Sequence, residues 1–438
     1  MEAGSALRRK CFWAADKILL HGEYRRFYNE TEKAYLEGTD AGDVNKKLEK
    51  LLSHAADTTK FYAAFKGVFE LNRFPVMNKI QYQQKPDEFV SSAYKNVKCH
   101  KHSTSGSTGV PLEILYSPEK GRKRYGTSIF LNTLADYNIG DRQAYARVWS
   151  QNYKKSFLEQ KAMNLIQIET TYLDKAHLQE ICDILVKKRV TSLAGHASAL
   201  SELCFYIRDN NIDCSKFHLK SITPGSEPMT PYVREELKKM FHCPVCQIYG
   251  AEEFGTVGMQ MKDSYEYYVD TSSVFVEVFK MDEDVPAEDG EPGRLIVTDL
   301  YSFAFPIIRY ENGDIVASRK ERLPNGRYRQ YFTEIYGRRA DLIYSTDGRT
   351  VAPMLLSNKM QACTDMGIIQ WKFVQSGEKT YFFEINGDSR RVDEQFIRGL
   401  ILDDIGQDAE ISFRYVDNIP VLNSGKRKYV ENQWRRNA

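Results

Sequence analysis

The sequence predicts an α/β protein made of a large N-terminal α/β domain with an appended β subdomain, and a small α+β domain at the C-terminus. Three observations predict this class. Helical and strand-like segments alternate from about residue 98 onward, which is typical of an α/β sheet. Strands and turns prevail between residues 274 and 309, and a new pattern of hairpin, helix and strand follows residue 341. We place the domain boundary between residues 1–338 and 339–438.

Residues 1 to about 70 are expected to form helices that pack as a layer. Over Ala41–Ala56 the apolar residues Val44, Leu48, Leu51 and Leu52 recur at helical spacing with charges between them. The α/β region is expected to contain helices over 177–188, 197–208 and 230–241, and strands over 218–223 and 244–249.

Turn residues separate the later strands. The cluster over 288–293 divides an alternating segment over 273–280 from a β-rich segment over 294–298. In the C-terminal domain, strands over 370–374 and 380–385 are expected to form a hairpin, followed by a helix over 393–403 and a strand over 410–416.

Composition and charge exclude several classes of protein. The 438 residues contain 61 Lys and Arg against 59 Asp and Glu, a formal charge of +2, so nucleic acid is not an expected partner. With 42% hydrophobic and 27% charged residues, we expect an ordinary soluble globular protein. No apolar run approaches the ~18 residues of a membrane span, and no secretory signal is evident, so we expect a cytoplasmic protein. The sequence does not fix the oligomeric state.

The eight cysteines are scattered, which suits reduced thiols rather than a disulfide framework. Cys243 and Cys246 have the spacing of a redox or zinc motif. They fall in an expected short strand over 243–248, where residues three apart point to opposite faces and cannot easily share a metal. We interpret them as small buried residues.

The segment His102–Pro111 is rich in hydroxyl residues and glycine. Glycine allows the backbone to approach a ligand closely, and hydroxyl and amide groups can surround phosphate oxygens. The segment lacks the lysine of a Walker loop, and on its own it fits either a phosphate-binding loop or a flexible linker. The candidate cofactor-binding residues of this segment are Thr104, Ser105, Gly106, Ser107, Thr108 and Gly109.

Three further loops follow expected strands, a place where ligands bind in α/β proteins. Thr223–Pro228 lies between a strand and a helix. Tyr249–Gly255 combines an aromatic ring with two carboxylates, which suits a base and a divalent cation. Pro306–Asp314 is expected to form a turn that presents Asp314 to two ribose hydroxyls. Together the loops would supply contacts to phosphate, base, metal and ribose.

In this order the motifs resemble those of the adenylate-forming enzymes. Within that superfamily the chain is most similar to the phenylacetate-coenzyme A ligase branch, including its capsule-biosynthesis relatives. The resemblance covers nearly the whole chain, and six motifs in order are far more specific than any one of them. The matching motifs are Ser103–Gly109, Gly225–Pro228, Tyr249–Glu253, Arg309–Asp314, Gly337–Asp341 and Ser424–Lys426.

The resemblance implies a two-step ligase. A carboxylic acid would attack the α-phosphorus of ATP with release of pyrophosphate, and the acyl-adenylate would then pass its acyl group to coenzyme A. By the same match, Glu253 would bind Mg²⁺ and Asp314 the ribose, and Arg338 would lie near the ribose and the domain junction. The residues that would flank the adenine are Ser226, Glu227 and Tyr249, and Gly250 is a further candidate cofactor-binding residue.

Lys426 matches the catalytic lysine of the family, a cation near the α-phosphate and the attacking carboxylate, where negative charge develops. The alternative is that residues 425–428 are only a basic surface tail, with Lys428 as the nearest rival. Because Val416–Pro420 precedes Lys426 as it does in the family, we favour the catalytic interpretation. The C-terminal domain would be mobile and would turn at Arg339–Asp341 between the two half-reactions.

The chain departs from the family pattern at three places. Glu252 replaces the threonine that usually precedes the magnesium-binding glutamate, which adds negative charge beside Glu253. Residues 259–262 lack a cysteine that many relatives have there, which weakens a zinc site near Cys243. Tyr344 replaces a lysine that often ends the hinge motif.

The identities of the acid and of the acceptor stay open. Trp149, His196, Gly225 and Phe254 are expected to line an acyl pocket, whose aromatic residues favour an aryl or apolar acid. Coenzyme A is the leading acceptor. The alternatives are a small amine, as in an amide ligase of capsule or other polysaccharide biosynthesis, a carrier protein, or a nucleotide-binding protein without turnover. The basic run over 122–124 suits a coenzyme A phosphate no better than it suits a solvated helix face.

Overall fold

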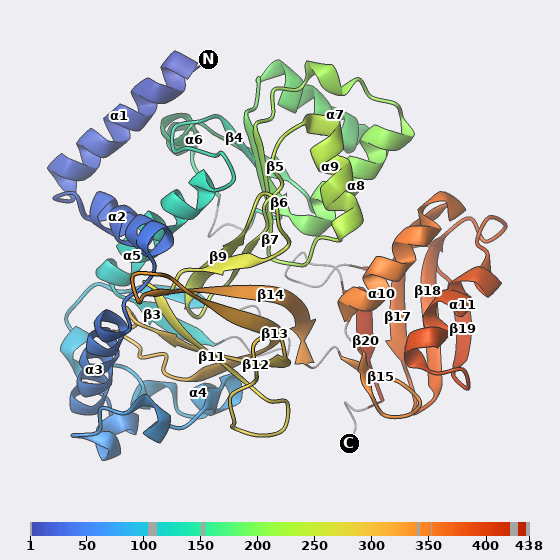
Figure 1. Cartoon of the computed structure of the whole chain (residues 1–438). Helices are drawn as coiled ribbons and strands as arrows, with labels where there is room; N and C mark the ends of the chain where they lie inside the picture. The colour runs from blue at the N-terminus through green and yellow to red at the C-terminus, as the bar shows by residue number, and fades with distance from the viewer. Residues whose placement is uncertain are drawn as a thin grey trace.

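The computed structural model describes residues 2–103, 112–149, 154–339, 342–351, 353–420 and 428–434. The chain is a mixed α/β protein in which the blue N-terminal helices and the orange C-terminal elements lie on opposite sides of the central sheets (Figure 1). Over the described ranges, no helix is long and apolar enough to cross a bilayer. The expected α/β class is confirmed, while the boundary at residues 338 and 339 stays a prediction.

The chain begins with three helices, α1 (Glu2–Leu19), α2 (Glu23–Glu37) and α3 (Ala41–Thr58), as the apolar periodicity predicts. Helix α3 begins where Asp40 accepts hydrogen bonds from the backbone N–H groups of Gly42 (2.8 Å) and Asp43 (3.2 Å), which caps the helix. Leu51 and Leu52 on its apolar side are fully buried. Strand β1 (Met77–Asn78) and helix α4 (Lys79–Gln84) follow.

Strands β2 (His100–Ser103) and β3 (Glu113–Tyr116) pair antiparallel on either side of the hydroxyl-rich segment, and α5 (Pro118–Thr133) follows. Helix α5 packs closely against α2. A Cβ atom at Gly126 would lie 2.7 Å from the Cβ of Phe27, so glycine is required at this contact. The contact fixes α5 between the N-terminal helices and the candidate site.

A parallel sheet in the order β5-β4-β6-β7 forms the α/β part of the chain. Its strands are β4 (Gln143–Arg147), β5 (Leu165–Glu169), β6 (Ser192–His196) and β7 (Ser221–Gly225). The helices around it are α6 (Phe157–Met163), α7 (Lys175–Lys187), α8 (Ala197–Asp209) and α9 (Pro231–Phe241) (Figure 1). A core of aliphatic residues and cysteines fills the space between these strands and helices.

A second, mostly antiparallel sheet has the order β11-β12-β13-β14-β10-β9-β8, and β1 adds to β13 in parallel. Its strands are β8 (Ile248–Ala251), β9 (Gly255–Gln260), β10 (Tyr267–Val269), β11 (Val274–Phe279), β12 (Pro292–Asp299), β13 (Tyr310–Arg322) and β14 (Tyr328–Arg338). The expected turn over 306–314 is wrong in its second half, because residues 310–314 pair with β12 and β14 as the first part of β13. A register shift between Ile315 and Val316 accommodates the irregular sequence there.

The C-terminal elements surround a third sheet in the order β19-β18-β17-β20. Strands β17 (Ile368–Gln375) and β18 (Thr380–Gly387) form the expected hairpin, and α11 (Glu394–Ile405) and β19 (Glu410–Tyr415) follow as predicted. The remaining elements are β15 (Ile343–Tyr344), β16 (Thr350–Val351), α10 (Pro353–Met360) and β20 (Val430–Asn432). Their buried apolar residues form a core of their own.

Cys243 and Cys246 lie before β8 rather than inside a strand. The strand expected over 243–248 is therefore wrong in its bounds, and Val245 makes only an isolated bridge to Ile222. Both thiols are buried, but Cys243 packs in the core beside α9 while Cys246 packs against Met259 and Tyr268. In the parts of the chain that the structure describes, no cluster of three or more His, Cys, Asp or Glu side chains could hold a metal ion.

Candidate functional site

The described part of the candidate nucleotide site lies where β8, β13 and β14 meet. The hydroxyl of Tyr249 on β8 donates a hydrogen bond to Oδ2 of Asp314 at 2.5 Å. The side-chain amide of Asn312 donates to the same oxygen at 2.7 Å, and Nε of Arg338 lies 3.0 Å from Oδ1. The structure thus brings together Tyr249, Asp314 and Arg338, which are 89 residues apart in sequence at most. Because each oxygen of Asp314 has a partner, a ribose would share or replace these donors.

Backbone pairing and ring packing fix this cluster. Asp314 and Arg338 are direct partners in the pairing of β13 with β14. The ring of Tyr249 packs edge-on against Phe332 of β14, with centroids 5.6 Å apart. Arg338 also donates to the backbone carbonyl of Asn312 at 2.9 Å. The polar groups are therefore held by strands rather than by a free loop.

Charges in the cluster are complementary. Burial raises the pKa of Tyr249 well above its usual value, and the carboxylate of Asp314 raises it further, so the phenol stays a neutral donor. Asp314 raises the pKa of Arg338, because the carboxylate favours the charged guanidinium. The cluster presents a permanent cation beside a carboxylate, which suits a nucleotide with both hydroxyl and phosphate groups.

Glu253 is a buried carboxylate next to this cluster, with 9% of its surface exposed. The hydroxyl of Tyr310, on β13, donates to Oε1 of Glu253 at 2.9 Å. Mg²⁺ is commonly held by one or two carboxylates together with substrate phosphates and water. A single well-positioned carboxylate fits that mode, and among the described residues Glu253 belongs to no cluster of three or more His, Cys, Asp or Glu side chains that could hold a metal ion by themselves.

The backbone of Glu253 is held from behind by a buried lysine. Nζ of Lys120, on α5, donates to the carbonyl oxygen of Glu253 at 3.0 Å and pairs with Oδ2 of Asp299 at 2.7 Å. The ammonium also lies 3.9 Å from the ring centroid of Tyr116. The hydroxyl of Tyr116 donates to the carbonyl of Glu252 at 2.7 Å. Lys120 and Tyr116 therefore fix both peptide groups of this carboxylate pair.

Glu252 has partners of its own. Its Oε2 lies 3.4 Å from Nδ1 of His102 and 3.4 Å from a guanidinium nitrogen of Arg124. Burial opposes ionisation, but the hydrogen bond from His102 and the charge of Arg124 prevail and lower the pKa of Glu252 to about 2. The carboxylate of Glu252 therefore forms an ion pair with Arg124 and a contact with His102, and these partners offset the negative charge that it adds beside Glu253.

The basic run over 122–124 makes internal contacts, and its interpretation as a solvated helix face is wrong for the buried Lys123. Lys123 is buried and donates to Ser272 at 2.8 Å. Arg122 pairs with Glu23, and Arg124 pairs with Glu252.

Local contacts and backbone conformation hold the residues expected to bind the nucleotide base. Ser226 adopts a left-handed conformation with φ of 71° directly after β7. The carboxylate of Glu227 accepts hydrogen bonds from the backbone N–H (2.9 Å) and the hydroxyl (2.5 Å) of Ser198 at the start of α8. A Cβ atom at Gly250 would lie 2.4 Å from the carbonyl oxygen of Gly255, so only glycine fits there.

Three of the four expected acyl-pocket residues lie at the carboxyl ends of the parallel strands. Trp149 follows β4 and donates its ring N–H to the carbonyl of Ile168 at 3.0 Å. His196 ends β6 and is the register partner of Gly225, which ends β7. No described atom lies within 4 Å of the position that a Cβ on Gly225 would take, so open space adjoins it. Phe254 instead packs in the hydrophobic core with Tyr310.

Three groups of expected residues lie outside the described residues. The structure describes Ser103 and Glu113 as paired ends of β2 and β3, with the phosphate-loop residues between them. The expected residues that lie outside the description are Thr104, Ser105, Gly106, Ser107, Thr108, Gly109 and Lys426, together with Ala340 and Asp341 of the hinge motif.

Four residues that the sequence did not single out belong to the site. They are Asn312, Tyr310, Lys120 and Lys79. Lys79 begins α4, next to the pairing of β1 with β13. Burial lowers the pKa of Lys79, the charge of Glu253 raises it, and the charge of Arg338 lowers it further. Asn312 was within reach of sequence reasoning because it lies two residues from Asp314. The others depend on strand pairings and helix packing between distant segments.

The chain is similar in sequence to several known proteins. Residues 343–433 match the family described as the CapK C-terminal domain. Protein CapK from Staphylococcus aureus is 24% identical over 442 residues, which cover 95% of this chain and 94% of CapK. The phenylacetate-coenzyme A ligase of Escherichia coli (strain K12) is 28% identical over 313 residues, covering 61% of this chain and 65% of that enzyme.

The fold has close counterparts among solved structures. A crystal structure of 2-hydroxyisobutyryl-CoA ligase in the postadenylation state, in complex with 2-HIB-AMP, superposes with a TM-score of 0.71. The match covers 89% of both chains at 15% sequence identity. The chain is therefore a homologue of CapK and of the phenylacetate-coenzyme A ligases, and it has the fold of the adenylate-forming acyl-CoA ligases.

Proposed function

We propose that the chain activates a carboxylic acid with ATP and transfers the acyl group to coenzyme A. The observation that supports this most directly is the cluster of Tyr249, Asn312, Asp314 and Arg338 next to the buried carboxylate of Glu253. This arrangement offers contacts to a nucleotide and a metal ligand in one place, within the fold of adenylate-forming ligases.

In the first step, a carboxylate oxygen of the acid forms a bond to the α-phosphorus of ATP as the bond to pyrophosphate breaks. This step needs positioning and charge neutralisation rather than covalent help from the protein. Asp314 and Tyr249 would hold the ribose, and Arg338 adds positive charge beside it. Glu253 would hold Mg²⁺, which offsets phosphate charge when bound. Lys426 would supply the cation near the attacking carboxylate.

In the second step, the sulfur of coenzyme A would form a bond to the acyl carbon as AMP leaves with the bonding electrons. We propose that residues 339–438 turn between the steps and that Arg339–Asp341 is the hinge. Pyrophosphate release and thioester formation can be measured separately in an Asp341→Pro variant. Unequal losses in the two rates are expected, and equal losses would argue against the hinge.

An amine acceptor is the second candidate. The similarity to CapK, which extends over nearly the whole chain, favours keeping an amide ligase of capsule or other polysaccharide biosynthesis beside the thioester ligase. A carrier protein is a third acceptor, and binding of nucleotide without turnover is the alternative from another class. The candidates differ in what they consume, so an assay of products distinguishes them.

The test is carboxylate-dependent release of pyrophosphate from ATP and Mg²⁺ across aryl, fatty, hydroxy and amino acids, with and without coenzyme A. We expect release with one class of acid and stimulation by coenzyme A. Stimulation by amines instead would favour the amide ligase. ATP binding without release for any acid would support the non-catalytic alternative.

Two pairs of variants link the activity to named residues. Lys426→Ala should lose most of the pyrophosphate release, whereas Lys428→Ala, two residues away, should keep it. Glu253→Gln should raise the Mg²⁺ requirement, whereas Glu252→Gln should change it less, because Glu252 pairs with His102 and Arg124. Reversed outcomes in either pair would assign the role to the neighbour.

A further inference from the structure

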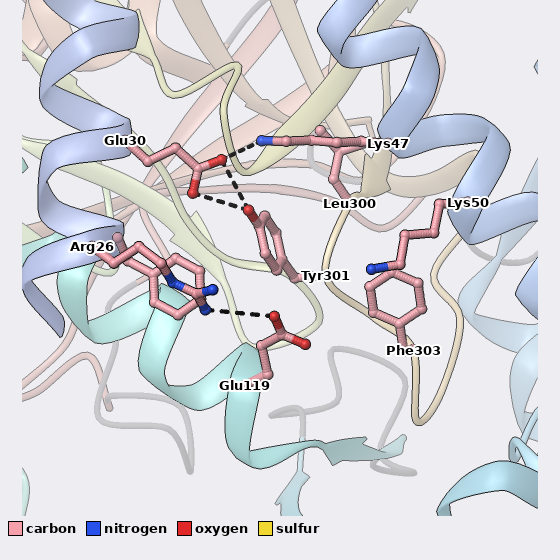
Figure 2. A pocket seen from close by; sticks show the side chains of 9 residues that line it. Arg26, Glu30, Lys47, Lys50, Glu119, Leu300, Tyr301 and Phe303 are labelled. Atoms are coloured by element: carbon pink, nitrogen blue, oxygen red, sulfur yellow. Dashed lines mark hydrogen bonds and ion pairs between the residues drawn. The ribbon is translucent and has the colours of Figure 1, made fainter. Parts of the chain in front are cut away.

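A cavity of about 340 Å³ opens between α2, α3, α5 and residues 300–303 (Figure 2). None of the candidate nucleotide-site residues lines it. Its volume lies at the lower end of the range for small-molecule sites, about 300–1,000 Å³. The cavity therefore has room for a ligand apart from the one bound at Asp314 and Glu253.

The inner wall of the cavity is held rigidly. The hydroxyl of Tyr301 lies 2.9 Å from both carboxylate oxygens of Glu30, which also pairs with Lys47 and, at 3.3 Å, with the buried Lys123. Burial opposes ionisation of Glu30, but Lys123 and Lys47 prevail and lower its pKa. The charge of Glu30 is thus met by neighbouring cations, and the ring of Tyr301 is a fixed apolar surface.

Two further cations lie at the mouth of the cavity. The ammonium of Lys50 lies 5.3 Å from the ring centroid of Phe303, and among the described residues it makes no hydrogen bond or ion pair. The guanidinium of Arg26 is 57% exposed and pairs with Glu23 at 3.3 Å and with Glu119 at 3.7 Å, and Figure 2 shows it on the other side of Tyr301 from Lys50. Lys50 is therefore the group most available to a ligand.

The remaining wall is aromatic. Phe27 and Phe303 are 2% and 8% exposed, and Phe27 packs edge-on against Tyr301 with centroids 5.6 Å apart. The lining contains three cations against two carboxylates, so its formal charge is positive. A hydrated ion such as phosphate would make no apolar contact with the aromatic rings, and the charges of a polyphosphate would be repelled by Glu119. A ligand with one negative charge and an apolar body would pair with a cation and also pack against the rings.

We propose that this cavity binds a small aryl or alkyl monocarboxylate. Its carboxylate pairs with Lys50, and its apolar body lies against Tyr301 and Phe303, with Arg26 and Glu119 closing the other end. The proposal concerns a site beyond the proposed ligase reaction and does not depend on it, because none of the residues that line this cavity has a part in that reaction.

The test is isothermal titration of the full chain with benzoate, up to about 10 mM, in the absence of nucleotide. We expect saturable binding that weakens about tenfold or more in Lys50→Ala, since charge-assisted hydrogen bonds are roughly twice as strong as neutral ones. The matched control is Lys46→Ala, one turn away on α3, whose exposed ammonium lies 3.8 Å from Asp43 and outside the cavity. Lys46→Ala should bind benzoate as the unchanged chain does.

Three outcomes would overturn the proposal. They are no benzoate binding in this range, equal binding by Lys50→Ala and the unchanged chain, and equal weakening in both lysine variants. Inorganic phosphate serves as a second probe. If it binds as tightly as benzoate, and with the same dependence on Lys50, the aromatic wall plays no part and the assigned ligand class is wrong.

Discussion

Replacing Lys120 with methionine removes a buried cation while keeping a side chain of similar length. Lys120 is 3% exposed, and it pairs with Asp299, which is also 3% exposed, at 2.7 Å. The substitution leaves the carboxylate of Asp299 buried without this cation, and it removes the donor that holds the carbonyl of Glu253 at 3.0 Å. We therefore expect losses in both stability and positioning of Glu253.

The size of the stability loss follows from the burial of the pair. Removing one partner of a buried ion pair costs about 3–5 kcal/mol, because the other charge stays desolvated. Burial lowers the pKa of Lys120 while Asp299 opposes that effect, so the carboxylate helps to keep the buried ammonium charged. The backbone N–H of Tyr301 still donates to Asp299 at 2.9 Å, which places the expected cost toward the lower end, about 3 kcal/mol.

The assay is urea unfolding of the unchanged chain, Lys120→Met, Asp299→Asn and the double variant. Asp299→Asn keeps an oxygen for Tyr301 but removes the charge, so the double variant should recover much of the stability lost in Lys120→Met. A cost below about 1 kcal/mol for Lys120→Met would refute the reasoning. A double variant less stable than either single variant would refute it as well.

Three further outcomes are expected. Tyr249→Phe removes the hydroxyl that donates to Asp314 at 2.5 Å. Because hydrogen bonds to charged groups contribute about 1.5–3 kcal/mol, a titration should show ATP binding weakened about tenfold, and unchanged affinity would contradict a role of Tyr249 at the nucleotide. The pKa of Glu252 is lowered from its ordinary 4.5 to about 2, so ionised Glu252 stabilises the fold above pH 4.5 and this stabilisation is lost as the pH falls toward 2. In urea unfolding at a series of pH values, Glu252→Gln should therefore lose less stability on acidification than the unchanged chain, and an equal loss would refute this. Burial raises the pKa of Cys243 to about 12 and that of Cys246 to about 11, so both thiols should react slowly in the native chain. Peptide mass spectrometry should show iodoacetamide on the exposed Cys11 in the native chain and on Cys243 and Cys246 only after unfolding, and native labelling of Cys246 would contradict its burial.

Local patterns predicted the helices and hairpins well, because their causes are local. The apolar spacing of Val44, Leu48 and Leu51 predicted α3, and the alternation around Ser376 predicted the hairpin of β17 and β18. Residues 310–314 were expected to be a turn because they contain Asn312 and Gly313. Pairing with β12 and β14 outweighs that preference, and Gly313 takes a positive φ of 84° within the strand.

The candidate site was predicted in part. Tyr249 and Asp314 follow from a motif order that resembles a known family, and the structure brings them into contact. Lys120 and Tyr310 could not be predicted, because their roles depend on where α5 packs and on which strand lies beside Glu253. The partners of Glu252 were missed for the same reason, since His102 and Arg124 come from separate elements.

The separate C-terminal core bears on how the chain unfolds. Its buried residues all come from Ile343 to Val430, and they pack with one another. A segment with its own apolar core can lose its surface contacts with the rest of the chain without exposing that core to water. Heating should therefore give two calorimetric transitions. The backbone amides of β17 and β18 should exchange with solvent at a rate set by the unfolding of the C-terminal elements alone.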